Sequence, residues 1–193
     1  DTAQLEPPWS ATNAVAVSAG AAHAVALLAT GEAVAWGDNT FGQAAIPAGV
    51  GSFVSVAAGF RHSLGLRVDG SIVAWGDDTT DQASPPAGTN YTAISAGGAH
   101  SLALRQNGTV AAWGANNYGQ TNVPADLDQV VAVAASEAYS LALKADGTVV
   151  AWGSGSSGQT NIPPGHSNVV AIAASPTYAM ALSGGTLPYV TSP

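Results

Sequence analysis

The sequence has no cysteine, one methionine and only four lysine and arginine residues among its 193 residues. The missing cysteines exclude disulfides, thiolate catalysis and thiolate metal sites. Four cations and a formal net charge of −8 leave no basic face for phosphates, so we expect neither nucleic acid nor an anionic membrane as a partner. No apolar run approaches the roughly 20 residues that span a bilayer, which predicts a chain that does not insert into membranes.

The composition that remains is typical of a compact, soluble globular domain. Hydrophobic residues make up 47% of the chain and charged residues only 8%. The scarcity of lysine favours an extracellular or cell-surface protein of a bacterium. We expect a monomer.

A repeat of about 39 residues organises the chain. Four tryptophans recur at intervals of 39, 38 and 39 residues, namely Trp36, Trp75, Trp113 and Trp152. Each tryptophan has a glycine five residues before it, a glycine directly after it and a glutamine seven residues after it. These glutamines are Gln43, Gln82, Gln120 and Gln159, and a proline follows each by four residues. Fixed offsets of this kind indicate repeated supersecondary units.

Each repeat predicts four short strands. Residues 130–136 form a run of small residues, residues 140–144 alternate with period two, and an Asp-Gly turn then leads into a third strand that ends at Trp152. The segment around the glutamine and proline is expected to form a fourth strand at the outer edge, where a proline is tolerated. Repeated four-stranded antiparallel units predict an all-β fold, a β-propeller.

The two ends of the chain predict how the propeller closes. Residues 186–190 should form the third strand of a last unit, whose glutamine would fall beyond the C-terminus. Gln4, with Pro8 four residues after it, supplies the missing glutamine and proline of this unit from the N-terminus. We therefore expect a single domain, 1–193, with five blades, the last one shared by both termini. The blades are residues 14–52, 53–90, 91–129, 130–168, and 169–193 with 1–13. The alternative is that the chain is part of a seven-bladed ring. In that case the two termini would fit the repeat in phase only by coincidence.

The repeated pattern resembles the bacterial branch of the regulator of chromosome condensation repeat family. It is carried by residues 96–104, 107–114 and 116–120, and the likeness covers nearly the whole chain. Known members are mostly seven-bladed propellers that bind proteins, including an exchange factor for a small GTPase and β-lactamase inhibitory protein II. The resemblance implies a propeller used for recognition. It does not transfer either activity, because those activities reside in turn residues that vary between repeats. A ring of five blades departs from the usual count and is similar to that of lectins of the tachylectin type.

Candidate binding residues lie in turns that break the repeat. In an antiparallel meander, the first and third turns of every blade emerge on one face, and these turns vary while the frame is constant. The candidate ligand-binding residues on this face are Phe41, Phe60, Arg61, Asn117, Tyr118 and Glu137. The aromatic residues could anchor a protein or a sugar ring, or they could cap their own blades. Arg61 could act as an anchor or could pair with Asp78. The opposite face, with Arg67, Arg105 and Lys144, shows ordinary turn chemistry.

Several other residues have structural interpretations. His23, His62 and His100 share one repeat position with Tyr139 and Tyr178, and a ring with a polar tip predicts a hydrogen bond between blades. They would be spread around the ring, so we expect no metal site. The tryptophans should pack between blades. Asp77, Asp78 and Asp81 could hold a cation, but without the glycine frame of a calcium loop they are more typical of solvated turn acids.

The sequence therefore predicts a non-catalytic binding module without a cofactor. No pair of a nucleophile and a base, and no converging pair of carboxylates, is evident, so we expect no enzyme. The variable face would bind a protein partner. The alternatives are a glycan-binding propeller and a structural spacer in a larger surface protein.

Overall fold

The computed structural model describes residue 8 and residues 11–163 and 168–184. Within these residues the chain forms five antiparallel sheets in which consecutive strands are neighbours. The first two sheets comprise β1 (Ala14–Ala19), β2 (His23–Leu28) and β3 (Ala33–Gly37), then β4 (Phe53–Ala58), β5 (His62–Arg67) and β6 (Ile72–Gly76). The next two comprise β7 (Tyr91–Ala96), β8 (His100–Arg105) and β9 (Val110–Gly114), then β10 (Val130–Ala135), β11 (Tyr139–Lys144) and β12 (Val149–Gly153). The last sheet pairs β13 (Val169–Ala174) with β14 (Ala179–Ser183). The all-β propeller architecture and the number of sheets agree with the sequence prediction.

The hairpins follow from the repeated turn residues. Between β5 and β6, Gly70 adopts a φ of 78°, and the Asp69 carboxylate accepts a hydrogen bond from the backbone N–H of Ser71 at 2.9 Å. An Asp or Asn before a glycine stabilises such a turn, because its side chain bonds to the backbone two residues on. Asn107 and Asp146 make the corresponding bonds to Thr109 and Thr148. The turn signal in the sequence thus fixes the pairing of the second and third strands.

Among the residues that the structure describes, the predicted fourth strand is not formed. The segment after each third strand consists of turns and bends, so the first four sheets each have three strands. In the first repeat the Asn39 and Gln43 side chains accept hydrogen bonds from the backbone N–H groups of Ala44 and Phe41, at 2.9 and 2.8 Å. These local bonds, together with Gly42 at a φ of 82°, fold the segment into turns. Its N–H groups are then not available for hydrogen bonds to a neighbouring strand.

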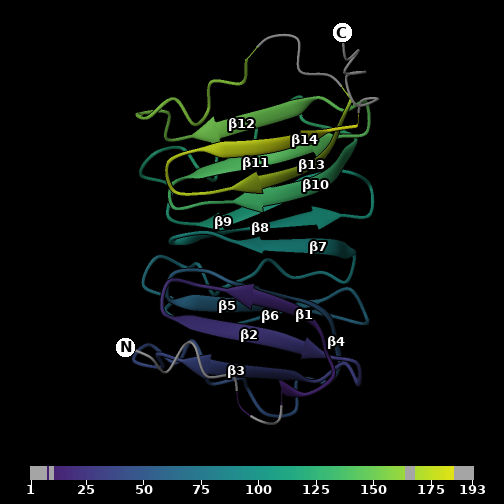
Figure 1. Cartoon of the computed structure of the whole chain (residues 1–193), viewed down its shortest axis with the longest axis vertical. Helices are drawn as coiled ribbons and strands as arrows, with labels where there is room; N and C mark the ends of the chain where they lie inside the picture. The colour runs from purple at the N-terminus through teal and green to yellow at the C-terminus, as the bar shows by residue number, and fades with distance from the viewer. Residues whose placement is uncertain (1–7, 9–10, 164–167, 185–193) are drawn as a thin grey trace, which may run out of the picture.

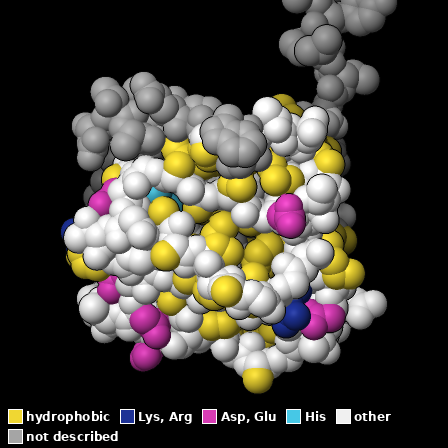
Figure 2. Space-filling view, turned by 90° about the horizontal axis from the view of Figure 1, so that it is seen from below, with side chains coloured by type: hydrophobic (Ala, Val, Ile, Leu, Met, Phe, Trp, Pro, Cys, Tyr) yellow, Lys and Arg dark blue, Asp and Glu magenta, His cyan; other side chains and the backbone are white. Residues whose placement is uncertain are grey.

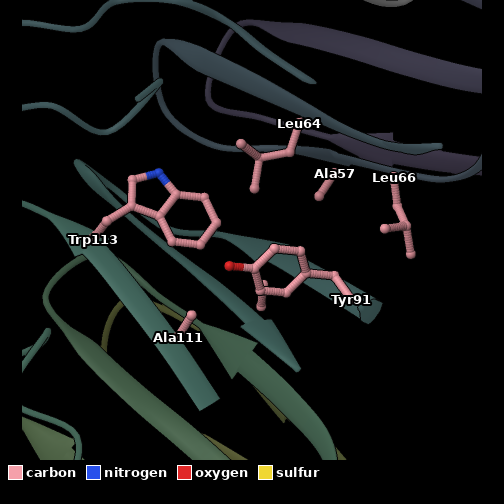
Figure 3. Close-up of a cluster of buried hydrophobic side chains, with 7 residues drawn as sticks. Ala57, Leu64, Leu66, Tyr91, Ala111 and Trp113 are labelled. Carbon is pink, nitrogen blue, oxygen red and sulfur yellow. The ribbon is translucent and has the colours of Figure 1, made fainter. Parts of the chain in front are cut away.

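The sheets pack face to face in sequence order. Contacts join β1 to β4, β4 to β7, β7 to β10 and β10 to β13, so the first strands of the sheets lie side by side. Figure 3 shows one junction, in which the rings of Tyr91 and Trp113 from the third sheet lie against Leu64 and Leu66 of the second. Leu64 is 0% exposed. The core is therefore a series of similar apolar layers between neighbouring sheets.

The described strands form an open arc. Figure 1 shows the first sheet at one end of the molecule and the last sheet at the other. Among the described strands, no set of contacts like those between neighbouring sheets joins β13 or β14 to β1. The predicted closure depends on residues 1–13 and 169–193, and the parts of that shared blade that would close it, the expected strand at 186–190 and the segment with Gln4, lie outside the described residues. The five-bladed closed ring therefore remains a prediction.

The surface carries few charges. Figure 2 shows acidic and basic side chains scattered among hydrophobic and uncharged polar ones, as the low content of charged residues requires. The described part of the chain contains no helix long and apolar enough to span a membrane.

Candidate functional site

The first turns of neighbouring sheets are joined by backbone hydrogen bonds. The N–H of Phe60 donates to the carbonyl of Gly97 at 3.2 Å, and the N–H of Gly98 donates to the carbonyl of Ser136 at 2.9 Å. Glycine is needed at position 98 because a Cβ there would lie 2.5 Å from the carbonyl oxygen of Glu137. The first turns of neighbouring sheets are thus held together by their backbones.

The third turns are each held by the glutamine of the repeat. The side-chain oxygen of this glutamine accepts a hydrogen bond from the backbone N–H of the residue two positions earlier in every described repeat. The donors are Phe41, Thr80, Tyr118 and Ser157, at 2.8 to 2.9 Å. The glutamines are almost fully buried. A fixed frame residue therefore holds a turn whose exposed side chains differ between repeats.

The first and third turns together enclose a cleft of about 630 Å³. Five of the six candidate residues line it, namely Phe60, Arg61, Asn117, Tyr118 and Glu137. They come from three different sheets, so only the packing of the sheets brings them together. The sixth, Phe41, lies under Arg61, whose guanidinium carbon is 4.5 Å from the centroid of the Phe41 ring. The structure thus groups all six residues on one face.

Arg61 stacks on an aromatic ring and does not pair with Asp78. Among the described residues its guanidinium makes no ion pair. A cation over an aromatic face is attracted by the ring quadrupole. The alternative proposed from the sequence fails because Asp78 is bound within its own turn, where its carboxylate accepts hydrogen bonds from Ala83 N and Ser84 Oγ at 2.8 and 2.7 Å.

The aromatic residues of the cleft differ in how far they are covered. Tyr118 is 63% exposed, whereas Phe60 and Phe41 are 37% and 39% exposed. Tyr118 therefore does not act as a cap on its own blade, while the other two rings are partly packed.

The acidic turn of the second repeat has a local role. Asp77 accepts a hydrogen bond from the backbone N–H of Thr79 at 3.1 Å, and Asp81 adopts a φ of 61°. Within the described residues, no three His, Cys, Asp or Glu residues are grouped as metal ligands would be.

The histidines of the repeat bond neighbouring sheets together, as the sequence predicts. The Nε2 atoms of His23, His62 and His100 lie 2.8 to 3.0 Å from the hydroxyls of Ser63, Ser101 and Ser140 in the next sheet. These hydroxyls donate their own hydrogens to the backbone carbonyls of Gln43, Gln82 and Gln120. Each histidine must therefore be the donor in its bond to serine, which places the proton of the neutral ring on Nε2.

Burial keeps these rings neutral. It lowers the pKa of His62 and of His100 to about 4, and a nearby histidine adds to the effect in each case. The histidine and serine side chains are 0% exposed. The pairs superficially resemble a base and its nucleophile, but no substrate could reach them, so they are structural.

Sequence reasoning missed the serines and the role of the glutamine. The backbone carbonyl of Gln82 accepts hydrogen bonds from both Ser101 Oγ, at 2.9 Å, and Trp113 Nε1, at 3.0 Å. The tryptophans thus pack between blades, as expected, and also donate to the preceding blade. These serines were a visible signal, because Ser63, Ser101 and Ser140 all occupy the repeat position directly after the histidine or tyrosine.

The opposite face carries turn chemistry. Lys144 pairs with Asp128 at 3.0 Å, Arg67 lies 3.7 Å from Asp69, and Arg105 lies over the ring of Tyr91. The cations there are engaged locally, in agreement with the sequence interpretation.

A family model matches four segments that together cover more than half of the chain. The model is described as the regulator of chromosome condensation (RCC1) repeat, and it matches residues 14–43, 53–82, 91–120 and 130–159. A search of curated proteins found no match.

Solved structures share the fold. A crystal structure of yeast RCC1 (Prp20) bound to Kap60 is 20% identical, with a TM-score of 0.76, over 92% of this chain and 55% of that chain. A second structure of Prp20p, from Saccharomyces cerevisiae, gives 21% identity and a TM-score of 0.74 over 92% of this chain and 56% of that one. The ectodomain of the receptor kinase CR4 from Physcomitrella patens is 26% identical, with a TM-score of 0.71, over 91% of this chain and 49% of that chain. The chain thus spans about half the length of the structures it matches.

Proposed function

This chain belongs to the RCC1 repeat family, and on that premise we propose that it is a non-catalytic module that binds a protein partner through the cleft formed by its first and third turns. One observation carries the proposal. Side chains that break the repeat, such as Phe60, Arg61 and Tyr118, converge on one cleft, whereas the histidines and serines of the repeat are buried between sheets.

The similar structures support a role in protein binding. Yeast Prp20 was crystallised with Kap60, and the second Prp20p structure is described together with binding to Gsp1p and histones. Loops on a rigid scaffold commonly carry recognition. In this chain the scaffold is the set of layers with His–Ser and Trp–Gln hydrogen bonds, and the recognition residues are those of the cleft.

The chemistry of the cleft suits a protein surface. Exposed Tyr118 and the stacked pair of Arg61 and Phe41 are of the residue types that dominate binding energy at interfaces. Glu137 and Asn117 add polar groups around them. A partner would bury the aromatic rings and satisfy the polar groups at the margin.

The test is a binding screen with substitutions on the two faces. Immobilised wild-type chain is screened against protein and glycan arrays, and each binder is measured again with Phe60→Ala, Tyr118→Ala and, as a control, Val68→Ala. Val68 is 70% exposed and follows β5, on the opposite face. We expect each cleft substitution to weaken binding by about 10-fold or more, since anchors of this type cost more than 1 kcal/mol when truncated. Equal affinity for all three variants would refute the proposed face.

A glycan is the second candidate, supported by one specific feature. The exposed ring of Tyr118 lies in a cleft that Asn117, Ser154 and Ser156 also line, so a flat apolar surface adjoins hydroxyl and amide groups. The same screen separates the two candidates, because only a glycan partner would be displaced by the free sugar.

A further inference from the structure

Three glutamines of the repeat line the cleft, namely Gln82, Gln120 and Gln159, and the last two stand in repeats that have no aspartate at the position of Asp38. Gln120 and Gln159 are 3% and 7% exposed, and both line the cleft. Their Oε1 atoms accept hydrogen bonds from the backbone N–H groups of Tyr118 and Ser157, at 2.9 and 2.8 Å. Because a backbone N–H can only donate, this bond fixes which end of each amide is oxygen. The NH₂ group must lie at the other end.

The first repeat shows one acceptor that such an amide binds. Gln43 makes the same bond to the backbone, with Phe41, and its Nε2 donates to the carboxylate of Asp38 at 2.7 Å. The repeat places Ala115 and Ser154 where the first repeat has Asp38. Among the described residues, Nε2 of Gln120 and Nε2 of Gln159 have no acceptor.

A ligand oxygen at these positions would be favourable. Neither Nε2 atom is among the described fully buried atoms without a partner, so each can be reached from the cleft, where an arriving acceptor would take the place of water. A hydrogen bond to a charged acceptor is stronger than one to a neutral acceptor. The guanidinium of Arg61, which lines the same cleft and makes no ion pair among the described residues, also favours an anion.

We propose that the side-chain amides of Gln120 and Gln159 are two binding points for carboxylate side chains of the protein partner, each carboxylate taking the place that Asp38 occupies in the first repeat. This inference rests on the proposed function, since it concerns the same cleft. Glu137 and Asp77 also line the cleft and oppose an anion. The partner must therefore direct its carboxylates to the two amides and away from these two acids.

The first test observes the amides directly. The full chain, labelled with ¹⁵N, is titrated with hexaglutamate peptide, and the side-chain NH₂ resonances are followed by NMR. We expect the resonances of Gln120 and Gln159 to shift and those of Gln43 to stay, because Asp38 already occupies that amide. Hexaglutamine is the neutral control. No shift, or an equal shift with hexaglutamine, would overturn the proposal.

The second test supplies the carboxylate from the chain itself. Ala115→Asp recreates the arrangement of the first repeat, so it should fill the site at Gln120 and weaken its response to hexaglutamate by about 10-fold or more, as expected for a charge-assisted bond. Gln159 should still respond, and Ser154→Asp should reverse the pattern. Ala115→Asn, of equal size and without charge, is the matched control. Equal blocking by Asp and Asn would contradict the preference for carboxylates.

The outcomes separate this inference from the proposed function. One possible result is that Phe60→Ala and Tyr118→Ala abolish binding of a partner from the screen while Ala115→Asp leaves it unchanged. The cleft then binds proteins, but the glutamine amides do not bind carboxylates of the partner. If the partner is indifferent to all of these substitutions, the proposed function itself is wrong.

Discussion

At the scale of single residues, the buried histidines make the free energy of unfolding of the chain depend on pH. His62 and His100 are neutral in the folded chain, and burial lowers their pKa from 6.5 to about 4. In the unfolded chain the same rings take up a proton near pH 6.5. Protonation therefore favours the unfolded state, and the stability present above pH 6.5 is lost as the pH falls toward 4.

We expect the free energy of unfolding to fall between pH 7.5 and pH 4.5 by up to roughly 3 kcal/mol for each of these histidines. Denaturation by urea at several pH values measures this. Carboxylates with lowered pKa values, such as Asp38 and Asp128, act in the same direction, but the ordinary pKa of an aspartate is 3.8, so they contribute mainly below this range. His62→Gln should reduce the slope, and a slope unchanged in that variant would contradict the assignment.

At the scale of elements, the junctions between sheets are of two kinds. A histidine faces a serine in the next sheet at the first three junctions. At the fourth, the hydroxyl of Tyr139 lies 2.7 Å from the carbonyl oxygen of Tyr178, and Ala179 stands in the place of the serine. The longer side chain reaches the backbone of the next sheet directly. A histidine in one sheet thus faces a serine in the next sheet, whereas Tyr139 faces a sheet that has an alanine at the serine position.

This pairing predicts a measurable coupling between β11 and β14. Tyr139→His should destabilise the chain, because the shorter ring cannot reach the carbonyl of Tyr178 and finds no hydroxyl at Ala179. Adding Ala179→Ser should recover part of the loss, since Ser140 shows how such a hydroxyl accepts from histidine and donates to the preceding glutamine carbonyl. In a double-mutant cycle we expect a favourable coupling of about 1 kcal/mol. Additive effects would show that the two positions do not interact.

The strands themselves were largely predictable, and the segment after them was not. Alternation and Asp-Gly turns identify β5, β6 and their equivalents because the period of two and the turn chemistry are local properties. The glutamine and proline segment looks like an edge strand by composition. It forms turns because the side chains of Asn39 and Gln43 bind its backbone, a preference that composition does not reveal.

At the scale of the whole molecule, the first and last sheets present apolar faces. Val17 is 68% exposed, whereas its equivalent in the second sheet, Val56, is 9% exposed. Leu182 is 64% exposed, against 2% for Leu66. Within the part of the chain that the structure describes, neither end has the neighbouring sheet that covers the equivalent residues elsewhere.

These end faces provide a test of ring closure. Because the Val17 side chain is exposed in the open arc of described strands, Val17→Asp should change the free energy of unfolding by less than about 0.5 kcal/mol, as is usual for surface positions. Val56→Asp, which buries a carboxylate between two sheets, should cost several kcal/mol or prevent folding. Thermal melts of the two variants measure the difference. Comparable losses at both positions would show instead that the ring closes over Val17.

The sequence by itself determined the repeated unit, its strand pairing and the face on which variable side chains emerge, because turn residues and alternation act over a few neighbouring positions. Tertiary structure decided which side chains meet. The bond from His62 to Ser101, the stack of Arg61 on Phe41 and the unused amide of Gln120 all depend on how successive sheets pack. The partners of the first two lie 39 and 20 residues apart, and no local pattern encodes the angle between sheets that brings them into contact.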